Sequence, residues 1–326
     1  MTNVKIIGTG KYLPDKIIDN EFLSNLVDTN DEWITSRSGI SERRISTGQN
    51  TSDMAVLAAK KALKDAGIDA SVIDLIIVST ISPDAHTPST ACLVQLGISA
   101  VNAICFDINA ACTGFIYAVE NAVQYIKTGR CRTALVISAE VLSKITDWTD
   151  RRTCVLFGDG AGAVVLQADD KKAGIRSIYT KADATYWETL KCSGEPLINP
   201  FFKEEKEKWG KIEMDGKEVF KFATGAIHEC IWKILEMEDL TLDDIAYIVP
   251  HQANIRIIEY AAKRNKIDMS KFYTNLDMYG NTSSASIPIA LAEMSEKHLL
   301  KRGDKIILIG FGGGLTHGAI LVEWTR

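Results

Sequence analysis

The sequence lacks an apolar run long enough to span a bilayer, and its first residues lack the apolar core of a signal peptide. It has no Cys-x-x-Cys pair, and its seven cysteines are odd in number, which argues against a disulfide framework. The five histidines show no metal-ligand spacing, so we expect no bound metal. A net charge of −5 argues against general nucleic-acid binding. These absences predict a protein of the reducing cytoplasm, without membrane or nucleic-acid partners.

The 326 residues, 46% hydrophobic and 24% charged, are typical of a globular protein with two domains or two fused halves. A weak internal repeat supports this. Residues 62–80 and 234–252 both read as a helix end, an aspartate turn (Asp74, Asp244) and a buried strand. Apolar runs at 133–137 and 162–166 recur in the same order at 305–309 and 318–322. We therefore predict a duplicated α/β fold with a mostly buried mixed sheet in each half, divided into residues 1–170 and 171–326.

The segment DINAACTGF at 107–115 places Cys112 between a short apolar strand and an amphipathic helix that stops near Gly129. The N-terminal end of a helix favours a thiolate, and small neighbours leave room for a substrate. A cysteine among alanines is also typical of a protein core. Cys112 is thus a candidate nucleophile that needs further support.

Two later segments supply that support. His251 follows a buried strand and precedes a helix, and Asn281 lies in a glycine-led turn before another helix. Active-site residues of α/β folds gather where strands end and helices begin. A lone histidine is more often structural, but Cys112, His251 and Asn281 at three such junctions favour one catalytic cleft between the halves.

Three other stretches need an interpretation. The glycine-rich segments at 158–162 and 312–314 lack the Gly-Lys-Ser/Thr of a phosphate loop, and we interpret both as tight turns beside the active site. The charge run KEEKEK at 203–208 is typical of a solvated surface. Five aromatic side chains around this run predict that residues 180–218 pack back over a substrate entrance: Tyr186, Trp187, Phe201, Phe202 and Trp209.

Seven motifs together resemble the β-ketoacyl-(acyl-carrier-protein) synthase III family of thiolase-like condensing enzymes. They are DEWI at 31–34, RSGI at 37–40, ACTGF at 111–115, FGDGAG at 157–162, HQAN at 251–254, GNTS at 280–283 and GFGGG at 310–314. The resemblance runs from the first strand to Trp324. It implies a thiolase-like fold of two pseudo-repeated halves in αβαβα layers, in agreement with the internal repeat, and a homodimer.

The resemblance implies that acyl-CoA acylates Cys112, and that decarboxylative condensation with malonyl-carrier protein then gives 3-oxoacyl-carrier protein, CoA and CO2. His251 and Asn281 would donate hydrogen bonds to the malonyl thioester oxygen. The backbone N–H groups of Cys112 and Gly313 would form the oxyanion hole, where glycine suits the close approach. CoA would be a substrate, and no cofactor is expected.

The resemblance also implies two binding surfaces. Stacking and cation–π contact would hold the adenine between Trp33 and Arg151, with Arg37 near the CoA phosphates and Asn254 near the pantetheine arm. A local basic patch would steer the acidic carrier protein, and its matching residues are Lys221, Arg256, Lys263 and Arg264.

The sequence departs from the family pattern at Thr87, at His317, where relatives often have tryptophan, and in residues 180–218, which are longer and differently composed. Thr87 replaces the bulky aromatic that acetyl-selective relatives carry at the end of the acyl pocket, so a longer or branched primer would fit. The chain length, the acceptor and the pathway stay open from sequence alone. The alternatives are a condensing enzyme or acyltransferase of secondary metabolism, a cysteine hydrolase that uses the Cys, His and Asn order, and a non-catalytic condensing-enzyme partner. Retention of Cys112 speaks against the last.

Overall fold

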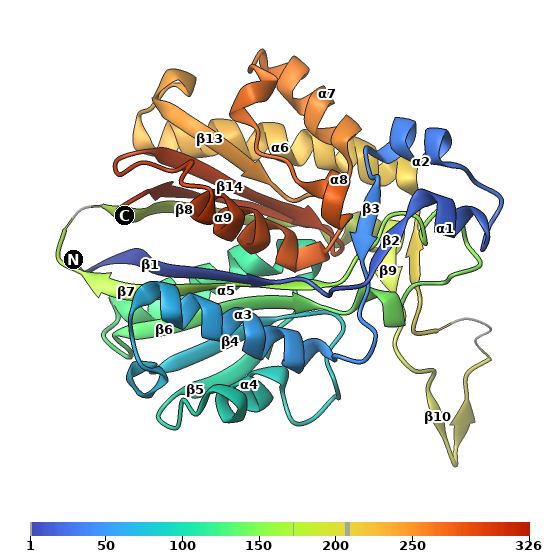
Figure 1. Cartoon of the computed structure of the whole chain (residues 1–326), viewed down its shortest axis with the longest axis horizontal. Helices are drawn as coiled ribbons and strands as arrows, with labels where there is room; N and C mark the ends of the chain where they lie inside the picture. The colour runs from blue at the N-terminus through green and yellow to red at the C-terminus, as the bar shows by residue number, and fades with distance from the viewer. Residues whose placement is uncertain (1, 172, 206–208) are drawn as a thin grey trace.

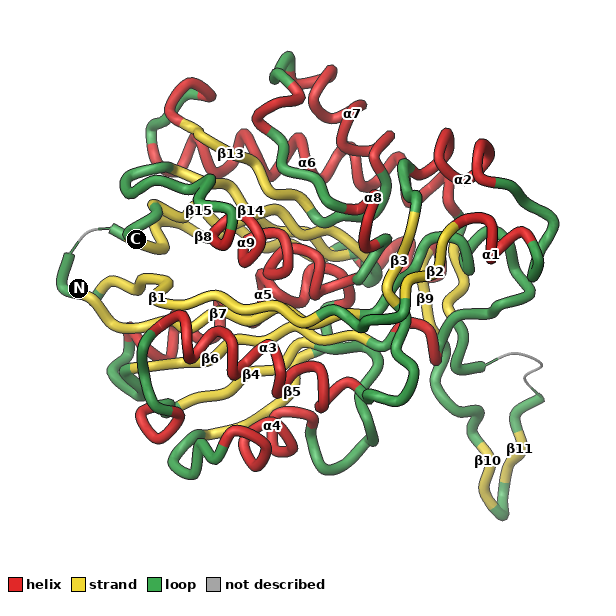
Figure 2. Tube along the Cα trace, viewed as in Figure 1, coloured by secondary structure: helices red, strands yellow, loops and turns green. Residues whose placement is uncertain are grey.

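A computed structural model of the chain describes residues 2–171, 173–205 and 209–326. Its body is built of helix, sheet, helix, sheet and helix layers, with both chain termini at the same end (Figure 1). Figure 2 shows the two yellow sheets running side by side, with the central helices between them. The predicted αβαβα order is confirmed.

Each half of the chain supplies one mixed sheet, as predicted. The first sheet has the order β1 (Asn3–Tyr12), β7 (Gly160–Asp169), β6 (Thr133–Glu140), β4 (Leu75–Ser79) and β5 (Ile104–Ile108). The second has the order β8 (Gly174–Ala182), β15 (Thr316–Glu323), β14 (Lys305–Gly312) and β13 (Ile245–Pro250).

The two sheets repeat the same pairing. Strand β4 runs parallel to β6, as β13 does to β14. Strand β7 runs antiparallel to β6 and to β1. In the same way, β15 runs antiparallel to β14 and to β8. The strand echoes seen in the sequence therefore occupy equivalent places. Strand β7 ends at Asp169 and β8 begins at Gly174, and the division into two domains at residue 170 stays a prediction.

In the described part of the chain, two helices fill the layer between the sheets and four cover the outside. The central pair is α5 (Gly114–Lys127) and α9 (Ser286–Glu296). The outer helices are α3 (Thr51–Ala66) and α4 (Thr90–Ile98) on the first sheet, and α6 (Gly216–Glu238) and α7 (Ile255–Asn265) on the second. Each half therefore supplies two outer helices and one central helix.

Helix α5 forms where the apolar residues recur at helical spacing. Phe115, Ile116, Val119, Val123 and Ile126 are all buried in the central core between the sheets. Full burial of such a side chain contributes about 1.5–3 kcal/mol. The start of α5 is therefore held from both sides, and Cys112 sits immediately before it.

Smaller elements extend one end of the layers, on the right in Figure 1. A cap is formed by β2 (Ile17–Asp19), α1 (Asn20–Ser24), α2 (Asp31–Ser38), β3 (Glu42–Arg44) and α8 (Leu276–Tyr279). We call the pair β9 (Leu190–Cys192) and β12 (Ile212–Met214) the strap. Between the two strap strands the chain makes a projecting hairpin, β10 (Ile198–Asn199) and β11 (Phe202–Lys203).

The packing predicted for the aromatic residues of 180–218 is wrong. Their exposed fractions run from 49% at Trp209 to 96% at Phe201. Only Trp209 of the five is among the described residues that line the main pocket. The hairpin carries Phe201 and Phe202 away from the body, and Tyr186 and Trp187 lie exposed in the 3₁₀ turn Ala184–Thr189 before β9. The strap residues line the pocket instead. Residues 206–208 of the charge run lie outside the described residues.

None of the described helices is both long and apolar enough to cross a bilayer. All seven cysteines are free thiols. Among the described residues, no group of three His, Cys, Asp or Glu side chains is placed to hold a metal ion.

Candidate active site

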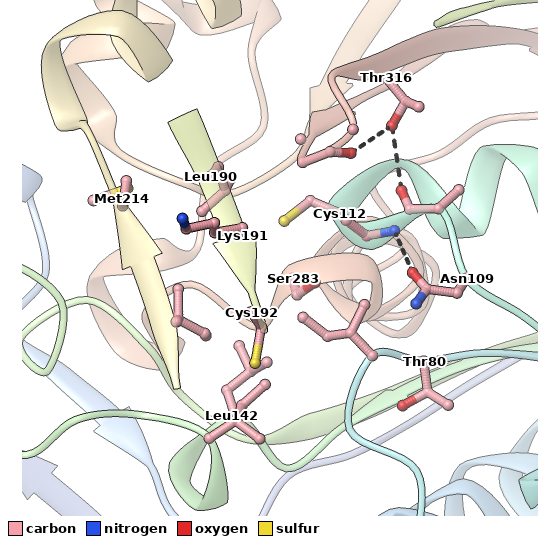
Figure 3. Close-up of a pocket in the computed structure, with 18 of the residues that line it drawn as sticks. Thr80, Asn109, Cys112, Leu142, Leu190, Lys191, Cys192, Met214, Ser283 and Thr316 are labelled. Atoms are coloured by element: carbon pink, nitrogen blue, oxygen red, sulfur yellow. Dashed lines mark hydrogen bonds between the residues drawn. The ribbon is translucent and has the colours of Figure 1, made fainter. Parts of the chain in front are cut away.

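A cavity of about 1280 Å³ opens where strands of both halves end, and it is lined by Cys112, His251 and Asn281 together. Thr80 follows β4 and Ile108 ends β5 from the first half, and His251 follows β13 from the second. The repeat brings these strand ends to one place, as the sequence predicted. Figure 3 shows Cys112 with its sulfur directed into this pocket, opposite the strap residues Leu190, Lys191 and Met214.

A strained turn presents Cys112. The 3₁₀ turn η2 (Ala111–Thr113) precedes α5, and Ala111 has a left-handed φ of 46°. For a residue with a Cβ this costs about 1–2 kcal/mol. Asn109 Oδ1 accepts the Ala111 N–H at 3.2 Å (Figure 3), and Ala110 O accepts the Thr113 N–H at 3.0 Å. These bonds hold the turn in its strained form.

The glycine loop that ends β14 lies directly against that turn. A Cβ at Gly312 would lie 2.7 Å from the Cys112 Cβ, and one at Gly313 would lie 3.4 Å from the Ala111 Cβ. The Thr316 hydroxyl lies 3.1 Å from Gly313 O and 3.0 Å from Thr113 Oγ1, so it joins the loop to the nucleophile turn (Figure 3). Only glycine permits this approach, which brings backbone of the loop beside Cys112.

The hydrogen bonds of His251 favour one tautomer. Its Nδ1 lies 2.7 Å from Ser286 Oγ, which itself accepts the Gln252 N–H at 3.3 Å. The hydroxyl hydrogen is therefore free to be donated to Nδ1, and the imidazole hydrogen is placed on Nε2. Burial lowers the pKa of His251 to about 3, so the ring is neutral. His251 is thus a neutral Nε2–H donor at the pocket.

The orientation of Asn281 is defined in the same way. Its Oδ1 accepts the Ser283 N–H at 2.8 Å, so its NH₂ group is the part left for the pocket. Its backbone bonds to Leu156 O at 2.8 Å and to the Gly158 N–H at 3.0 Å, which fixes the residue to the FGDGAG segment. His251 and Asn281 therefore both present N–H donors to one cavity.

The Cys112 thiol is not a thiolate in this site. Burial raises its pKa to about 12, and the Glu140 carboxylate adds to the rise while the Ser283 hydroxyl opposes it. The prediction that the helix end favours a thiolate is therefore wrong for the resting thiol. Loss of solvent is the main cause of the rise, because desolvation penalises the charged form.

An apolar wall completes the pocket beside the nucleophile. Leu142, Phe157 and Ile212 form a buried cluster, against which Ile145 and Leu190 pack. All five line the cavity. They come from the segment after β6, from the FGDGAG motif and from both strap strands. This surface suits an aliphatic chain attached to Cys112.

The residues predicted to bind the CoA nucleotide lie together, with Trp33 and Arg37 on α2 of the cap and Arg151 on the segment between β6 and β7. The guanidinium carbons of Arg151 and Arg37 lie 5.2 and 5.9 Å from the centre of the Trp33 ring. None of the three is among the described residues that line the cavity. Asn254 does line it, but its side chain caps α7 through the Arg256 N–H and donates to Arg37 O at 2.9 Å. Asn254 therefore joins the pocket to the cap.

Thr87 lies elsewhere. It is exposed and does not line the cavity of its own chain, although its neighbours Ala85, His86 and Ser89 do. The four residues of the predicted basic patch are exposed on the packed helices α6 and α7: Lys221, Arg256, Lys263 and Arg264. None of the four is among the described residues that line the pocket.

The sequence interpretation missed the groups that support the three central residues. Ser283 was visible only as the last residue of the GNTS motif, and Ser284 and Ser286 lie just beyond that motif. Each of the three supports a different part of the site. Glu140 was hidden as the last residue of a buried strand. A charged residue that ends an otherwise apolar strand was the available signal.

Comparisons with known proteins agree with this geometry. A family model described as 3-oxoacyl-(acyl-carrier-protein) synthase III matches residues 106–184, and the model of its C-terminal part matches residues 235–324. The chain is 58% identical over 324 residues to a β-ketoacyl-(acyl-carrier-protein) synthase III of Clostridium novyi, with 99% of this chain and 100% of the relative covered.

Solved structures give the same result. The 3-oxoacyl-(acyl-carrier-protein) synthase III of Aquifex aeolicus superposes with a TM-score of 0.93 at 44% identity, covering 99% of this chain and 100% of the other. The priming β-ketosynthase of the R1128 polyketide pathway superposes with a TM-score of 0.92 at 33% identity, covering 99% and 96%. The chain belongs to the β-ketoacyl-(acyl-carrier-protein) synthase III family and is an initiating condensing enzyme of type II fatty-acid synthesis.

Proposed function

We propose that this enzyme acylates Cys112 from acyl-CoA and condenses that acyl group with malonyl-carrier protein. In the first step the Cys112 sulfur forms a bond to the acyl carbon, the bond to CoA sulfur breaks, and the thiol proton leaves with CoA as its free thiol. The Gly312–Gly314 loop packed against the nucleophile turn supports this step. The backbone N–H groups of Cys112 and Gly313 stabilise the oxyanion, each donor contributing a few kcal/mol.

In the second step malonyl-carrier protein loses CO2, and the electron pair of the broken bond becomes an enolate on its thioester. The enolate carbon attacks the acyl carbon, and the bond to Cys112 breaks. The sulfur takes up a proton to regenerate the thiol. The observation that carries this proposal is that His251 and Asn281 present N–H donors to the pocket that Cys112 enters. Both donors would hold the enolate oxygen.

The binding surfaces belong to the same proposal. Adenine would lie at Trp33 and Arg151, with the CoA phosphates near Arg37 and the pantetheine arm passing Asn254, which lines the pocket between cap and nucleophile. The acidic carrier protein would dock on the basic patch of α6 and α7. The acyl group itself would lie against the apolar wall.

A homodimer is part of the proposal. Strand β5 is at the edge of the first sheet, and an edge strand tends to pair with another chain. Leu96, Val101 and Ile104 are exposed on or near it. In a dimer, Thr87 would reach the end of the partner's acyl pocket, and its small size would admit a longer or branched primer.

Intact-protein mass spectrometry with acyl-CoAs from acetyl to dodecanoyl tests the proposal. The wild type should gain one acyl group and Cys112→Ala none, and malonyl-carrier protein should discharge the adduct with CO2 release. His251→Ala should keep acylation and lose condensation, because its role begins at the enolate. No adduct with any acyl-CoA, or equal loss of both steps in His251→Ala, would contradict this scheme.

A second pathway is supported by the similarity to the R1128 priming synthase. The rate at which acyl-Cys112 is discharged can be compared between a malonylated fatty-acid carrier protein and a malonylated polyketide carrier protein. The faster acceptor identifies which of the two pathways the enzyme serves. The family match removes the cysteine-hydrolase alternative.

A further inference from the structure

Glu140 is a fully buried carboxyl group at the end of β6, behind the catalytic pocket. Its Oε2 accepts hydrogen bonds from the Ser82 hydroxyl at 2.7 Å, the Thr80 hydroxyl at 3.2 Å and the Ile81 N–H at 3.1 Å. Its Oε1 accepts one from the Ser284 hydroxyl at 2.7 Å. The first three groups belong to the segment after β4, and Ser284 belongs to the second half of the chain. One side chain thus links the two halves.

The hydrogens around this carboxyl group are arranged for an anion. The Ser82 hydroxyl already accepts the Val141 N–H at 2.9 Å, and the Thr80 hydroxyl accepts the Ser82 N–H at 3.1 Å. Both hydroxyls therefore have their own hydrogen to donate to Glu140, and the Ile81 N–H can only donate. Lys144 and Cys112 are the other titratable groups whose charge interacts with Glu140. Burial raises the pKa of Glu140 against the effect of these donors.

In the second half of the chain, Glu140 bonds to the turn that positions the two N–H donors of the site. Ser284 lies in the 3₁₀ turn η7 (Ser283–Ala285), between Asn281 and helix α9. In this turn the Ser283 N–H holds Asn281 Oδ1, and Ser286, just after it, holds His251 Nδ1. The position of η7 therefore sets the position of both donors. The nucleophile turn packs against η7, and it has a further tie to the glycine loop through the hydroxyls of Thr113 and Thr316.

We propose that Glu140 is a positioning residue for condensation, and that its bond to Ser284 holds the His251 and Asn281 donors in place relative to the first half. The inference rests on the proposed function, because it assigns these donors to the second step. If the bond is lost, η7 can shift while the turn of Cys112 and the glycine loop stay. A misplacement on the scale of 1 Å costs about 100-fold in rate. Condensation should then slow far more than acylation.

Ser284→Ala tests this with a small change that removes the link and leaves Glu140 its other three donors. We expect acylation of Cys112 by acyl-CoA at nearly the wild-type rate, and condensation slower by about 10- to 100-fold. Ser138→Ala is the matched control, since Ser138 is a buried serine on β6 whose hydroxyl has no hydrogen-bond partner among the described residues. It should leave both steps unchanged.

Glu140→Gln separates charge from position. Its amide oxygen can accept the three first-half donors, and its NH₂ can donate to Ser284, whose own hydrogen can turn to Ser79 O, 3.3 Å away. This variant should keep most of the condensation rate. It should also make the Cys112 thiol more acidic, seen as faster alkylation at a given pH, because a buried negative charge is removed.

Single-turnover acylation, steady-state condensation and melting temperature are measured on each full-length variant. Selective loss of condensation in Ser284→Ala supports the inference. Wild-type kinetics in this variant, or an equal loss of acylation and condensation, overturns it. Loss of condensation in Glu140→Gln as large as in Ser284→Ala also overturns it, because the charge would then be the essential feature. A wild-type enzyme that forms no adduct refutes the proposed function instead.

Discussion

The protonation state of Cys112 can be tested by the pH dependence of its alkylation in the absence of substrate. Only the thiolate reacts with iodoacetamide, so the rate follows the ionised fraction. Burial and the Glu140 carboxylate raise the pKa of Cys112 to about 12. The rate should therefore keep rising across the whole range in which the protein can be handled.

The size of the effect follows from that pKa. With a pKa of about 12, roughly 1 in 10⁴ Cys112 side chains is ionised at pH 8. An ordinary thiol with a pKa of about 8.5 is about one quarter ionised at that pH. The ionised fraction of Cys112 is thus lower by roughly 10³-fold, and it should rise tenfold with each pH unit up to pH 10.

Mass spectrometry of chymotryptic peptides, with cleavage after Leu93, Phe106 and Phe115, measures the rate at Cys112 separately from those at its neighbouring cysteines. Cys92 is exposed in the same chain and serves as the internal reference. The slope against pH is decisive, because burial also slows access of the reagent and lowers every rate by a common factor. A rate that levels off below pH 9 would show that the helix end dominates and would refute the reasoning.

Three further predictions concern His251, Gly312 and Arg256. Burial lowers the pKa of His251 to about 3, so as the pH falls from 6.5 towards 3 only the unfolded state binds a proton at this residue, and the folded state loses stability. Between pH 6.5 and pH 4.5 the free energy of unfolding, measured in urea, should therefore fall by about 2 kcal/mol more in the wild type than in His251→Asn. Equal decreases in the two proteins would contradict this prediction. Gly312→Ala places a Cβ 2.7 Å from that of Cys112 and should abolish acylation, while circular dichroism shows a retained fold; normal acylation would mean that the loop is not tightly packed there. Arg256→Glu should raise the KM for malonyl-carrier protein and leave that for acyl-CoA unchanged in steady-state assays, and a change in both would argue against a separate carrier surface.

The main architecture and the central residues could be predicted because both leave local patterns. Buried strands appear as continuous apolar runs, and their recurrence revealed the two sheets. Cys112 and His251 stand where a strand gives way to a helix, and Asn281 lies in the glycine-led turn between α8 and α9. All three line one pocket.

The rest could not be predicted because it depends on contacts between distant residues. The strap strands have three residues each and pair across a separation of about 20 residues, with too short a pattern to detect. The two-residue strands of the hairpin are likewise too short to detect. Its aromatic residues were therefore predicted to pack against the body. The pKa of Cys112 depends on Glu140 and on burial by the second half, neither of which a helix end reveals.

The two sides of the pocket differ in how freely they can change in evolution. Cys112 stands before a helix packed between two sheets, so substitutions there disturb the central core. Leu190 and Ile212 belong to a two-stranded strap outside the layers. A lineage can therefore exchange strap residues to accept a new primer while the reacting groups keep their places. Descendants of one scaffold can thus diverge in substrate without reinventing the chemistry.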